Sequence, residues 1–206
     1  MYKFPYYTEE DEAKVLAFMN ANPFVLITGI GKEYPVATYI PVETTINEAG
    51  KMVLSGHMMR KTDHHLAFEK NNNVLVVFNG PHCYVSASWY STPEIGSTWN
   101  YMTVHAKGKI SFTDEEGTLK AVKAVSDKYE GTTTAAAFDK LPASYVNSMV
   151  KAIVGFHIEV ESIENTFKLS QNRDEISKKN IIRELNARAD DNSKAIAAEM
   201  ESRMSN

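Results

Sequence analysis

The chain has little cysteine, no long apolar run and no excess of basic charge, and each shortage excludes a class of protein. With one cysteine, Cys83, in 206 residues, no disulfide can form within the chain, which favours a reducing compartment. No run approaches the ~18 apolar residues of a membrane helix, and residues 1–14 lack the apolar core of a signal peptide. We therefore expect a cytoplasmic protein without a membrane span.

Basic residues are too few to suggest nucleic acid as a partner. Lys and Arg number 22 against 26 Asp and Glu, which gives a formal net charge of -4. Phosphate contacts need a concentrated basic face. Direct binding of nucleic acid is therefore not expected, although net charge says nothing about a local basic patch.

What is present is an ordinary globular composition with a β-rich pattern. Hydrophobic residues make up 43% and charged residues 23%, close to the average for globular proteins. There is no repeat, low-complexity linker or break in composition. We expect one β-rich α+β domain with peripheral helices, followed from residue 174 to residue 206 by a helical tail that packs on the same domain.

Hydrophobic periodicity and turn residues locate the elements. The strands are expected at residues 24–29, 34–41, 52–57, 74–78, 83–88, 99–112 and 154–163. The helices are expected between Thr8 and Asn22 and at residues 63–70, 114–129 and 143–152. Residues 74–78 are all apolar, which predicts burial on both faces. Asn79-Gly80-Pro81-His82 predicts a tight turn that reverses the chain.

A basic pair at a strand end is the first candidate binding feature. Arg60 and Lys61 follow the strand that carries His57, and a helix is expected to begin directly after them. Arginine, lysine and the backbone N–H groups of a helix start suit a phosphate group. The alternative is a solvated loop of mixed polarity.

Metal and nucleophile chemistry find little support. His57, His64 and His65 match no ligand spacing, so no metal is expected. Gly29-Ile30-Gly31-Lys32 lacks the first glycine of a phosphate-binding loop and is interpreted as a hairpin turn. No Gly-x-Ser-x-Gly elbow is present, which argues against hydrolase chemistry.

Aromatic and small hydroxyl residues gather in the middle of the chain. Both tryptophans lie there, Trp89 beside Ser88 and Tyr90, and Trp99 between Thr98 and Asn100. Rings can bound a flat heteroaromatic ligand while hydroxyls and amides address its polar edge. The alternative is an aromatic core cluster.

A second polar group precedes the tail. Lys168, Gln171, Asn172 and Arg173 surround Leu169 and Ser170. Glutamine and asparagine offer donors and acceptors, while lysine and arginine serve an anion. A surface junction between a strand and a helix is the alternative.

These motifs, in this order, resemble the PaiB family. The resemblance rests on Gly56-His57 with Arg60, on the run from Phe78 to Tyr90, on Thr98-Trp99-Asn100-Tyr101 with Val104-His105-Ala106-x-Gly108, and on the run from Lys168 to Arg173. It extends over residues 1 to about 185. Several long motifs in the right order are more specific than any one of them.

The resemblance implies an FMN-binding split β-barrel over residues 1–173, related to pyridoxamine-phosphate-oxidase-like and flavin-reductase-like folds, in a homodimer with the flavin at its interface. It assigns Arg60 and Lys61 to the FMN phosphate. The other residues that it assigns to the cofactor are His57, Ser86, Ser88, Trp89, Tyr90, Thr98, Trp99, Asn100, Lys168, Gln171, Asn172 and Arg173.

Three functions remain open at this point. The first is a flavoprotein with flavin-dependent oxidoreductase activity, the redox chemistry being the cofactor's own. The second is a flavin-binding transcriptional regulator or sensor without turnover, because some members of the PaiB family are described as negative regulators of transcription. The third is a protein that holds haem or another planar ligand in the same barrel.

Overall fold

The computed structural model describes residues 1, 4–92 and 94–204. The end of the expected tail, Ser205 and Asn206, lies outside the described residues. Seven strands occur in the described part: β1 (Phe24–Gly29), β2 (Val36–Pro41), β3 (Glu43–Ile46), β4 (Met52–Met59), β5 (Asn73–Val85), β6 (Thr98–Phe112) and β7 (Ile153–Lys168). The α-helices of the same part are α1 (Glu12–Ala21), α2 (Asp63–Lys70), α3 (Glu115–Tyr129), α4 (Ala143–Ala152), α5 (Glu175–Asn186) and α6 (Asp191–Ser202). Short 3-10 turns are η1 (Pro5–Tyr7), η2 (Ala87–Trp89) and η3 (Phe138–Lys140).

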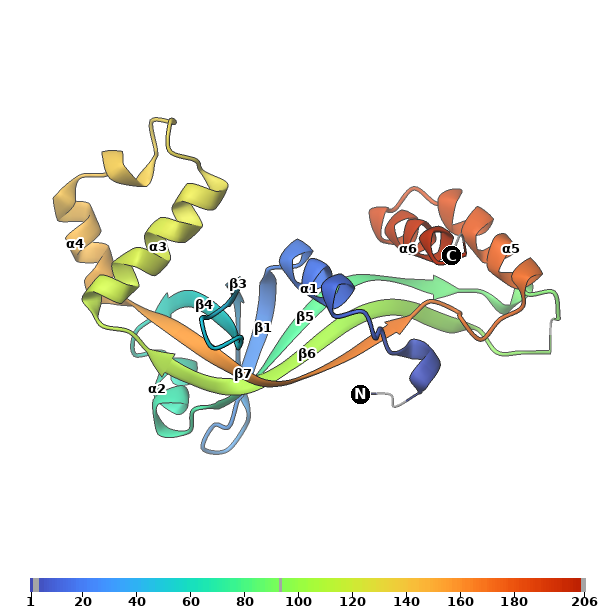
Figure 1. Ribbon diagram of the computed structural model, residues 1–206, viewed down its shortest axis with the longest axis horizontal. Coiled ribbons are helices and arrows are strands. Elements are labelled where there is room, and N and C mark those ends of the chain that lie inside the picture. Colours follow the sequence, from blue (N-terminus) through green and yellow to red (C-terminus); the bar gives the residue numbers. More distant parts are fainter. Residues whose placement is uncertain (2–3, 93, 205–206) are drawn as a thin grey trace. The chain divides into compact units, whose positions relative to one another are not determined.

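The strands form one sheet in the order β2-β1-β5-β6-β7-β4-β3, and Figure 1 shows its long strands β5, β6 and β7. Strand β1 pairs antiparallel with β2 and β5, and β4 pairs antiparallel with β3 and β7. Side chains alternate between the two faces of a strand, so in a strand that buries one face, successive residues are buried and exposed in turn. The β-rich α+β class predicted from the sequence is confirmed.

The chain divides into two compact units. Unit 1 comprises residues 1–18, 79–104 and 164–206, and unit 2 comprises residues 19–78 and 105–163. Strands β5, β6 and β7 each contribute residues to both units. The expected tail belongs to unit 1, together with the N-terminal residues and the two tryptophans.

Strand β5 corrects two expectations. Residues 79–82 do not reverse the chain, because β5 runs without interruption from Asn73 to Val85. The buried positions are even-numbered up to Phe78, whereas the next ones are Cys83 and Val85, so the strand changes phase at the expected turn. The pairing of β1 with β5 ends at Val77, so on the β1 side of the strand the missing N–H of Pro81 costs no ladder bond.

The second correction concerns burial in the first half of β5. Val74, Val76 and Phe78 are buried, but Leu75 and Val77 are only half-buried. An apolar run is therefore compatible with a strand that buries one face fully and the other in part. The expectation of full burial on both faces was wrong.

In unit 2, helix α3 begins against β7. Asp114 caps α3 by accepting a hydrogen bond from Gly117 N at 2.8 Å, and Gly155 N donates to Thr118 Oγ1 at 2.9 Å. Gly155 permits this approach, because a Cβ atom there would lie 2.5 Å from Thr113 Oγ1. A small apolar cluster contains residues of α3, η3, α4 and β7: Val122, Phe138, Ile153, Leu119, Leu141, Val146 and Met149.

In unit 1, helices α5 and α6 lie side by side (Figure 1). Asp174 caps α5 and Asp190 caps α6, each accepting from the backbone N–H three residues on. The apolar faces of the two helices are buried: Ile181, Leu185 and Ile196 have no exposed surface. The tail is therefore helical as predicted, but as two helices with a break at residues 187–190.

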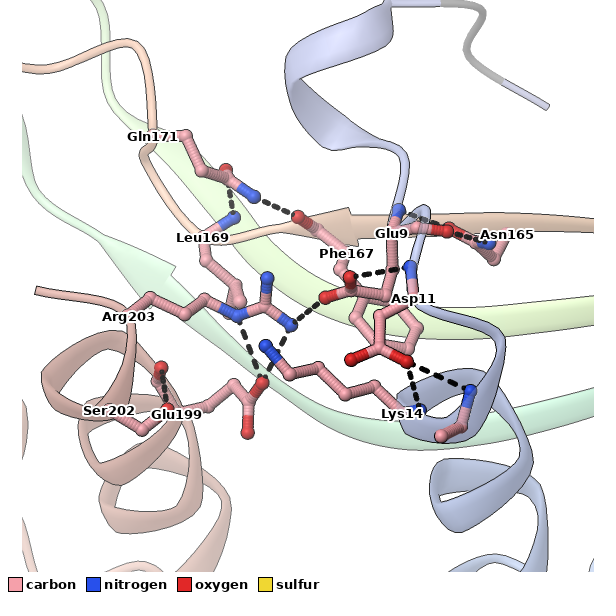
Figure 2. Close-up of polar contacts among 11 residues, drawn as sticks. Glu9, Asp11, Lys14, Asn165, Phe167, Leu169, Gln171, Glu199, Ser202 and Arg203 are labelled. Atoms are coloured by element: carbon pink, nitrogen blue, oxygen red, sulfur yellow. Dashed lines mark hydrogen bonds and ion pairs between the residues drawn. The ribbon is translucent and has the colours of Figure 1, made fainter. Parts of the chain in front are cut away.

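An ion pair fixes the end of α6 to the start of the chain, as Figure 2 shows. Arg203 Nη2 lies 2.6 Å from Glu9 Oε2 and 2.8 Å from Glu199 Oε1. The backbone of Glu9 is held by Asn165 on β7, which accepts from Glu9 N at 2.8 Å and donates to Glu9 O at 2.9 Å. Three parts of the sequence thus meet at this pair.

The remaining boundaries differ from the expectations in limited ways. Helices α2 and α4 and strand β1 have the predicted ends. Strand β3 was missed, β7 continues five residues past Ile163, and α1 begins at Glu12 rather than after Thr8. Over the residues that the structure describes, no helix has the length and apolar character needed to cross a membrane.

Candidate functional site

The predicted site residues divide between the two units. His57, Arg60 and Lys61 belong to unit 2, and the other predicted residues belong to unit 1. Each group is described within its own unit below.

Arg60 stands at the end of β4, anchored by its neighbours. Its backbone N–H donates to Ala152 O at 2.9 Å, and its side-chain Nε donates to Ile153 O at 2.7 Å. These bonds fix the guanidinium plane, while its two Nη atoms have no hydrogen-bond partner among the described residues. Lys61 follows with a φ of 62° and an exposed side chain. The two residues therefore present one oriented and one exposed cation at a strand end.

The start of α2 contributes less to anion binding than the sequence indicates. Thr62 Oγ1 accepts from His65 N at 3.4 Å, and Asp63 Oδ1 accepts from His64 N at 2.8 Å. Lys61 N donates to His65 Nδ1 at 3.4 Å. The N–H groups of His64 and His65 in the first turn are thus occupied by neighbouring side chains, so an anion here would depend mainly on the Arg60 and Lys61 side chains.

His57 lies on β4 opposite Gly155 of β7. Directly opposite residues of an antiparallel pair share a face, and a Cβ atom at Gly155 would meet Thr113 and Thr118 at the start of α3. His57 therefore lies on the face that α3 begins to cover. Burial lowers the pKa of His57, so the imidazole is neutral at neutral pH, and its buried Nδ1 has no hydrogen-bond partner within the described chain.

In unit 1, Trp99 is the centre of an exposed aromatic group. Trp99 is 54% exposed, and its ring centroid lies 6.2 Å from that of His82 and 6.1 Å from that of Tyr84. His82 and Tyr84 are on β5, and Trp99 is at the start of β6, which neighbours β5 in the sheet. The ring of Trp99 is available to a ligand or to another chain.

Trp89 lies in η2 and is covered on one side by a residue that the sequence did not single out. The guanidinium carbon of Arg188 lies 4.8 Å from the centroid of the Trp89 ring, and Arg188 Nη1 donates to Tyr84 O at 2.9 Å. Ser86 caps η2, and its hydroxyl lies 2.8 Å from that of Ser88. No local sequence signal marks Arg188, because it comes from the break between α5 and α6.

Two of the predicted amides are engaged within the chain. Asn100 has no exposed surface, accepts from Ser170 Oγ at 3.0 Å and donates to Met200 Sδ at 3.5 Å. Gln171 accepts from Leu169 N at 2.8 Å and donates to Phe167 O. The structure gives both side chains a positioning role, joining β6 to α6 and closing the turn after β7.

Lys168, Asn172 and Arg173 lie with two tyrosines. Lys168 Nζ donates to Thr98 Oγ1 and lies 5.9 Å from the centroid of the Tyr7 ring. The guanidinium carbon of Arg173 lies 4.5 Å from the centroid of the Tyr90 ring. Tyr7 is a second residue that the motifs missed, since its distance in sequence from residue 168 hides the contact.

The loop that carries Tyr90 is fixed to the start of α5. Ser91 N donates to Ser177 Oγ at 2.9 Å, and Ser91 Oγ donates to Asp174 Oδ2 at 2.9 Å. The hydrogen bonds from Ser177, and then the one from Ser91, lower the pKa of Asp174 from 3.8 to about 2. This network holds the loop beside the segment that carries Arg173.

Comparison with known proteins shows which family the sequence matches. Residues 1–162 match the model of a family described as "Putative FMN-binding domain". The chain is 33% identical over 205 residues to the Bacillus subtilis "Protease synthase and sporulation protein PAI 2", covering 99% of this chain and 98% of that protein. It is 27% identical to an uncharacterized protein of Emericella nidulans, over 73% of this chain and 76% of that one.

Solved structures show the same fold at low sequence identity. The flavocytochrome Anf3 from Azotobacter vinelandii aligns with a TM-score of 0.61 and 13% identity, over 81% of this chain and 72% of that one. The FAD and heme binding protein from Mycobacterium smegmatis aligns with a TM-score of 0.60 and 14% identity, over 79% and 73%.

The sheet and its peripheral helices have the split β-barrel fold, and the family match makes the chain a flavin-binding protein of this fold. Its cofactor is FMN. The chain belongs to the FMN-binding family whose model it matches over residues 1–162, and it is PaiB-like over nearly its whole length. The predictions of fold, family and cofactor are thereby confirmed, whereas the assignment of single residues to the cofactor stays a prediction.

Proposed function

We propose that two copies of this chain associate, bind FMN at their interface and use it to oxidise or reduce a small molecule. The observation that carries the proposal is Arg60, whose Nε is fixed to Ile153 O while its Nη atoms have no partner among the described residues. A guanidinium oriented in this way suits two parallel hydrogen bonds to a phosphate group. When bound, FMN supplies the hydride or electron transfer.

The chain's own groups have distinct proposed roles. Arg60 and Lys61 bind the phosphate, since both are cations that end one strand. The resemblance also assigns the hydroxyls of Ser86 and Ser88 and the ring of Trp99 to the cofactor, and within unit 1 these are polar or planar groups within reach of solvent. Asn100 and Gln171 act as positioning residues, because their amides are already bonded within the chain.

The homodimer is supported by the exposed aromatic group around Trp99. Large exposed rings on a sheet are typical of surfaces that meet a ligand or another chain. Sedimentation equilibrium of the FMN-loaded protein tests the assembly: a mass of two chains is expected, and a single-chain mass over the whole concentration range refutes it. We place the protein in the cytoplasm, on the basis of its single buried cysteine.

A titration with two flavins tests the phosphate role. We expect Arg60→Gln and Lys61→Gln to weaken FMN binding by about tenfold or more, the scale of a lost charge-assisted hydrogen bond. Riboflavin lacks the phosphate, so its affinity should be the same in all variants. Arg183→Gln removes the same charge from an exposed position of α5 and serves as the matched control. Equal loss of both flavins, or no loss of either, removes Arg60 from this role.

A flavin-binding regulator without turnover is the second candidate. It is favoured by the 33% identity over 99% of the chain to a Bacillus subtilis protein named for protease synthesis and sporulation. Turnover separates the two candidates. Repeated oxidation of NADH or NADPH by the FMN-loaded protein with an added acceptor supports the oxidoreductase, and a single reduction without turnover supports the regulator. A haem-like absorption band in place of the flavin bands contradicts both.

A further inference from the structure

Unit 1 contains two half-buried cations that have no carboxylate partner. Lys168 Nζ donates to Thr98 Oγ1 and lies over the Tyr7 ring, while the Arg173 guanidinium lies over the Tyr90 ring. Neither cation forms an ion pair within the residues that the structure describes. Charges withdrawn from water are ordinarily paired, because desolvation disfavours the charged form.

The carboxylate adjacent in sequence is committed elsewhere. Asp174 Oδ1 accepts from Ser177 N at 2.9 Å, and Asp174 Oδ2 accepts from Ser177 Oγ at 2.7 Å and from Ser91 Oγ at 2.9 Å. These bonds direct the carboxylate to the cap of α5. Asp174 therefore does not neutralise Arg173 by a direct contact.

A buried hydroxyl at the same place also lacks a partner. Tyr90 is 6% exposed, and its hydroxyl has no hydrogen-bond partner among the described residues. A buried hydroxyl without a partner costs free energy, which a ligand that accepts a hydrogen bond would recover.

Tyr7 shows that these groups are close together. Lys168 Nζ lies 5.9 Å from the centroid of the Tyr7 ring, and the Tyr7 hydroxyl donates to Oδ1 of Asn172, the residue before Arg173, at 3.5 Å. The pKa of Lys168 is lowered, first by burial and then by Arg173. The cluster is thus rich in donors and positive charge, and neither of its cations has a carboxylate partner among the described residues.

We propose that Lys168, Arg173 and the Tyr90 hydroxyl bind an oxyanion, a carboxylate or phosphate group carried by the molecule on which the flavin acts. The inference rests on the proposed function, in which Arg60 and Lys61 hold the phosphate of FMN. The same chemistry would fit that phosphate, and the experiment separates the two sources.

The test is calorimetric titration of inorganic phosphate into the FMN-loaded full-length chain. We expect saturable binding that Lys168→Gln and Arg173→Gln each weaken by about tenfold or more. Lys179→Gln and Arg183→Gln remove the same charges from exposed positions of α5 and should change nothing. Equal weakening by these controls would indicate a non-specific charge effect and overturn the proposal.

Tyr90→Phe provides a variant whose effect a structural role would not produce. It removes only a hydroxyl that has no partner in the protein, so the melting temperature without phosphate should be unchanged or higher, while phosphate binding weakens. A lower melting temperature with unchanged phosphate binding contradicts the proposal, even if the lysine and arginine variants fail to fold.

Three flavin states identify the source of the oxyanion. Phosphate binding that persists with FMN bound supports a separate ligand. Binding that FMN abolishes and riboflavin leaves intact means that the cluster holds the FMN phosphate, and overturns the inference. No phosphate binding by a chain with its full complement of FMN also overturns it, whereas a chain that takes up no FMN refutes the proposed function.

Discussion

Replacing Glu9 by glutamine tests whether the ion pair in Figure 2 stabilises unit 1. The substitution keeps the shape of the side chain and removes its charge. Glu9 and Arg203 have side-chain exposures of 9% and 23%, and their charged atoms lie 2.6 Å apart. The pair joins the N-terminal segment to the end of α6, although most of the chain lies between Glu9 and Arg203 in the sequence.

The magnitude follows from this partial burial. Breaking a fully buried pair costs about 3–5 kcal/mol, whereas an exposed pair contributes about 0–1 kcal/mol. In the variant, Arg203 still has Glu199 at 2.8 Å, and about a quarter of its side chain is exposed to water. Both reduce the free-energy cost of losing the pair with Glu9. We expect Glu9→Gln to lower the free energy of unfolding by about 2 kcal/mol, and to have little effect when Arg203 is already methionine.

Urea unfolding at one fixed protein concentration measures this coupling, since association would otherwise shift the midpoint. Both tryptophans belong to unit 1, so their fluorescence reports on the part that contains the pair. Glu175→Gln, which breaks the more exposed pair with Lys178, is the matched control. A coupling energy below about 0.5 kcal/mol in the double-mutant cycle would refute the reasoning.

Three further predictions concern the same unit. Gly80→Ala should lower the free energy of unfolding by about 1–3 kcal/mol, because the new Cβ atom would lie 2.4 Å from the Phe18 ring. A thermal melt measures the effect, and Gly96→Ala, whose Cβ atom would have nothing within 4 Å, is the control. The pKa of Asp174 is lowered from 3.8 to about 2 in the folded state, so the stability that its carboxylate contributes is present above pH 3.8 and is lost as pH falls toward 2. Asp174→Asn should therefore make the melting temperature depend less on pH between 3.8 and 2. An unchanged dependence of melting temperature on pH contradicts this prediction. Burial raises the pKa of Cys83 to about 11, so a thiol reagent at neutral pH should label it only after unfolding; rapid labelling of the native protein would be inconsistent with this burial.

Local sequence determined most of the helices and strands, and it placed the basic pair Arg60 and Lys61 at a strand end. Strand β1 and helices α2 and α4 have the expected ends because turn residues, caps and periodicity act within a few residues. Arg60 and Lys61 are found at a strand end as predicted. The order of the motifs also identified the FMN-binding family, because ordered motifs persist where single residues vary.

Tertiary contacts decided what local signals could not. Asn79-Gly80-Pro81-His82 has every mark of a turn, yet β5 continues through it, as a neighbour of β6 in the sheet and with the Phe18 ring packed against Gly80. The strand neighbours, not the turn residues, determined the outcome.

The candidate site shows the same division. The sequence by itself determined the kinds of groups available: cations, hydroxyls, amides and aromatic rings in family order. Only the folded chain decided that the amides of Asn100 and Gln171 are used internally, and that Lys168 and Arg173 lie beside Tyr7 and Tyr90 without a carboxylate. Such pairings join residues from distant parts of the sequence, and no local pattern records which of them meet when the apolar faces of α5 and α6 are buried.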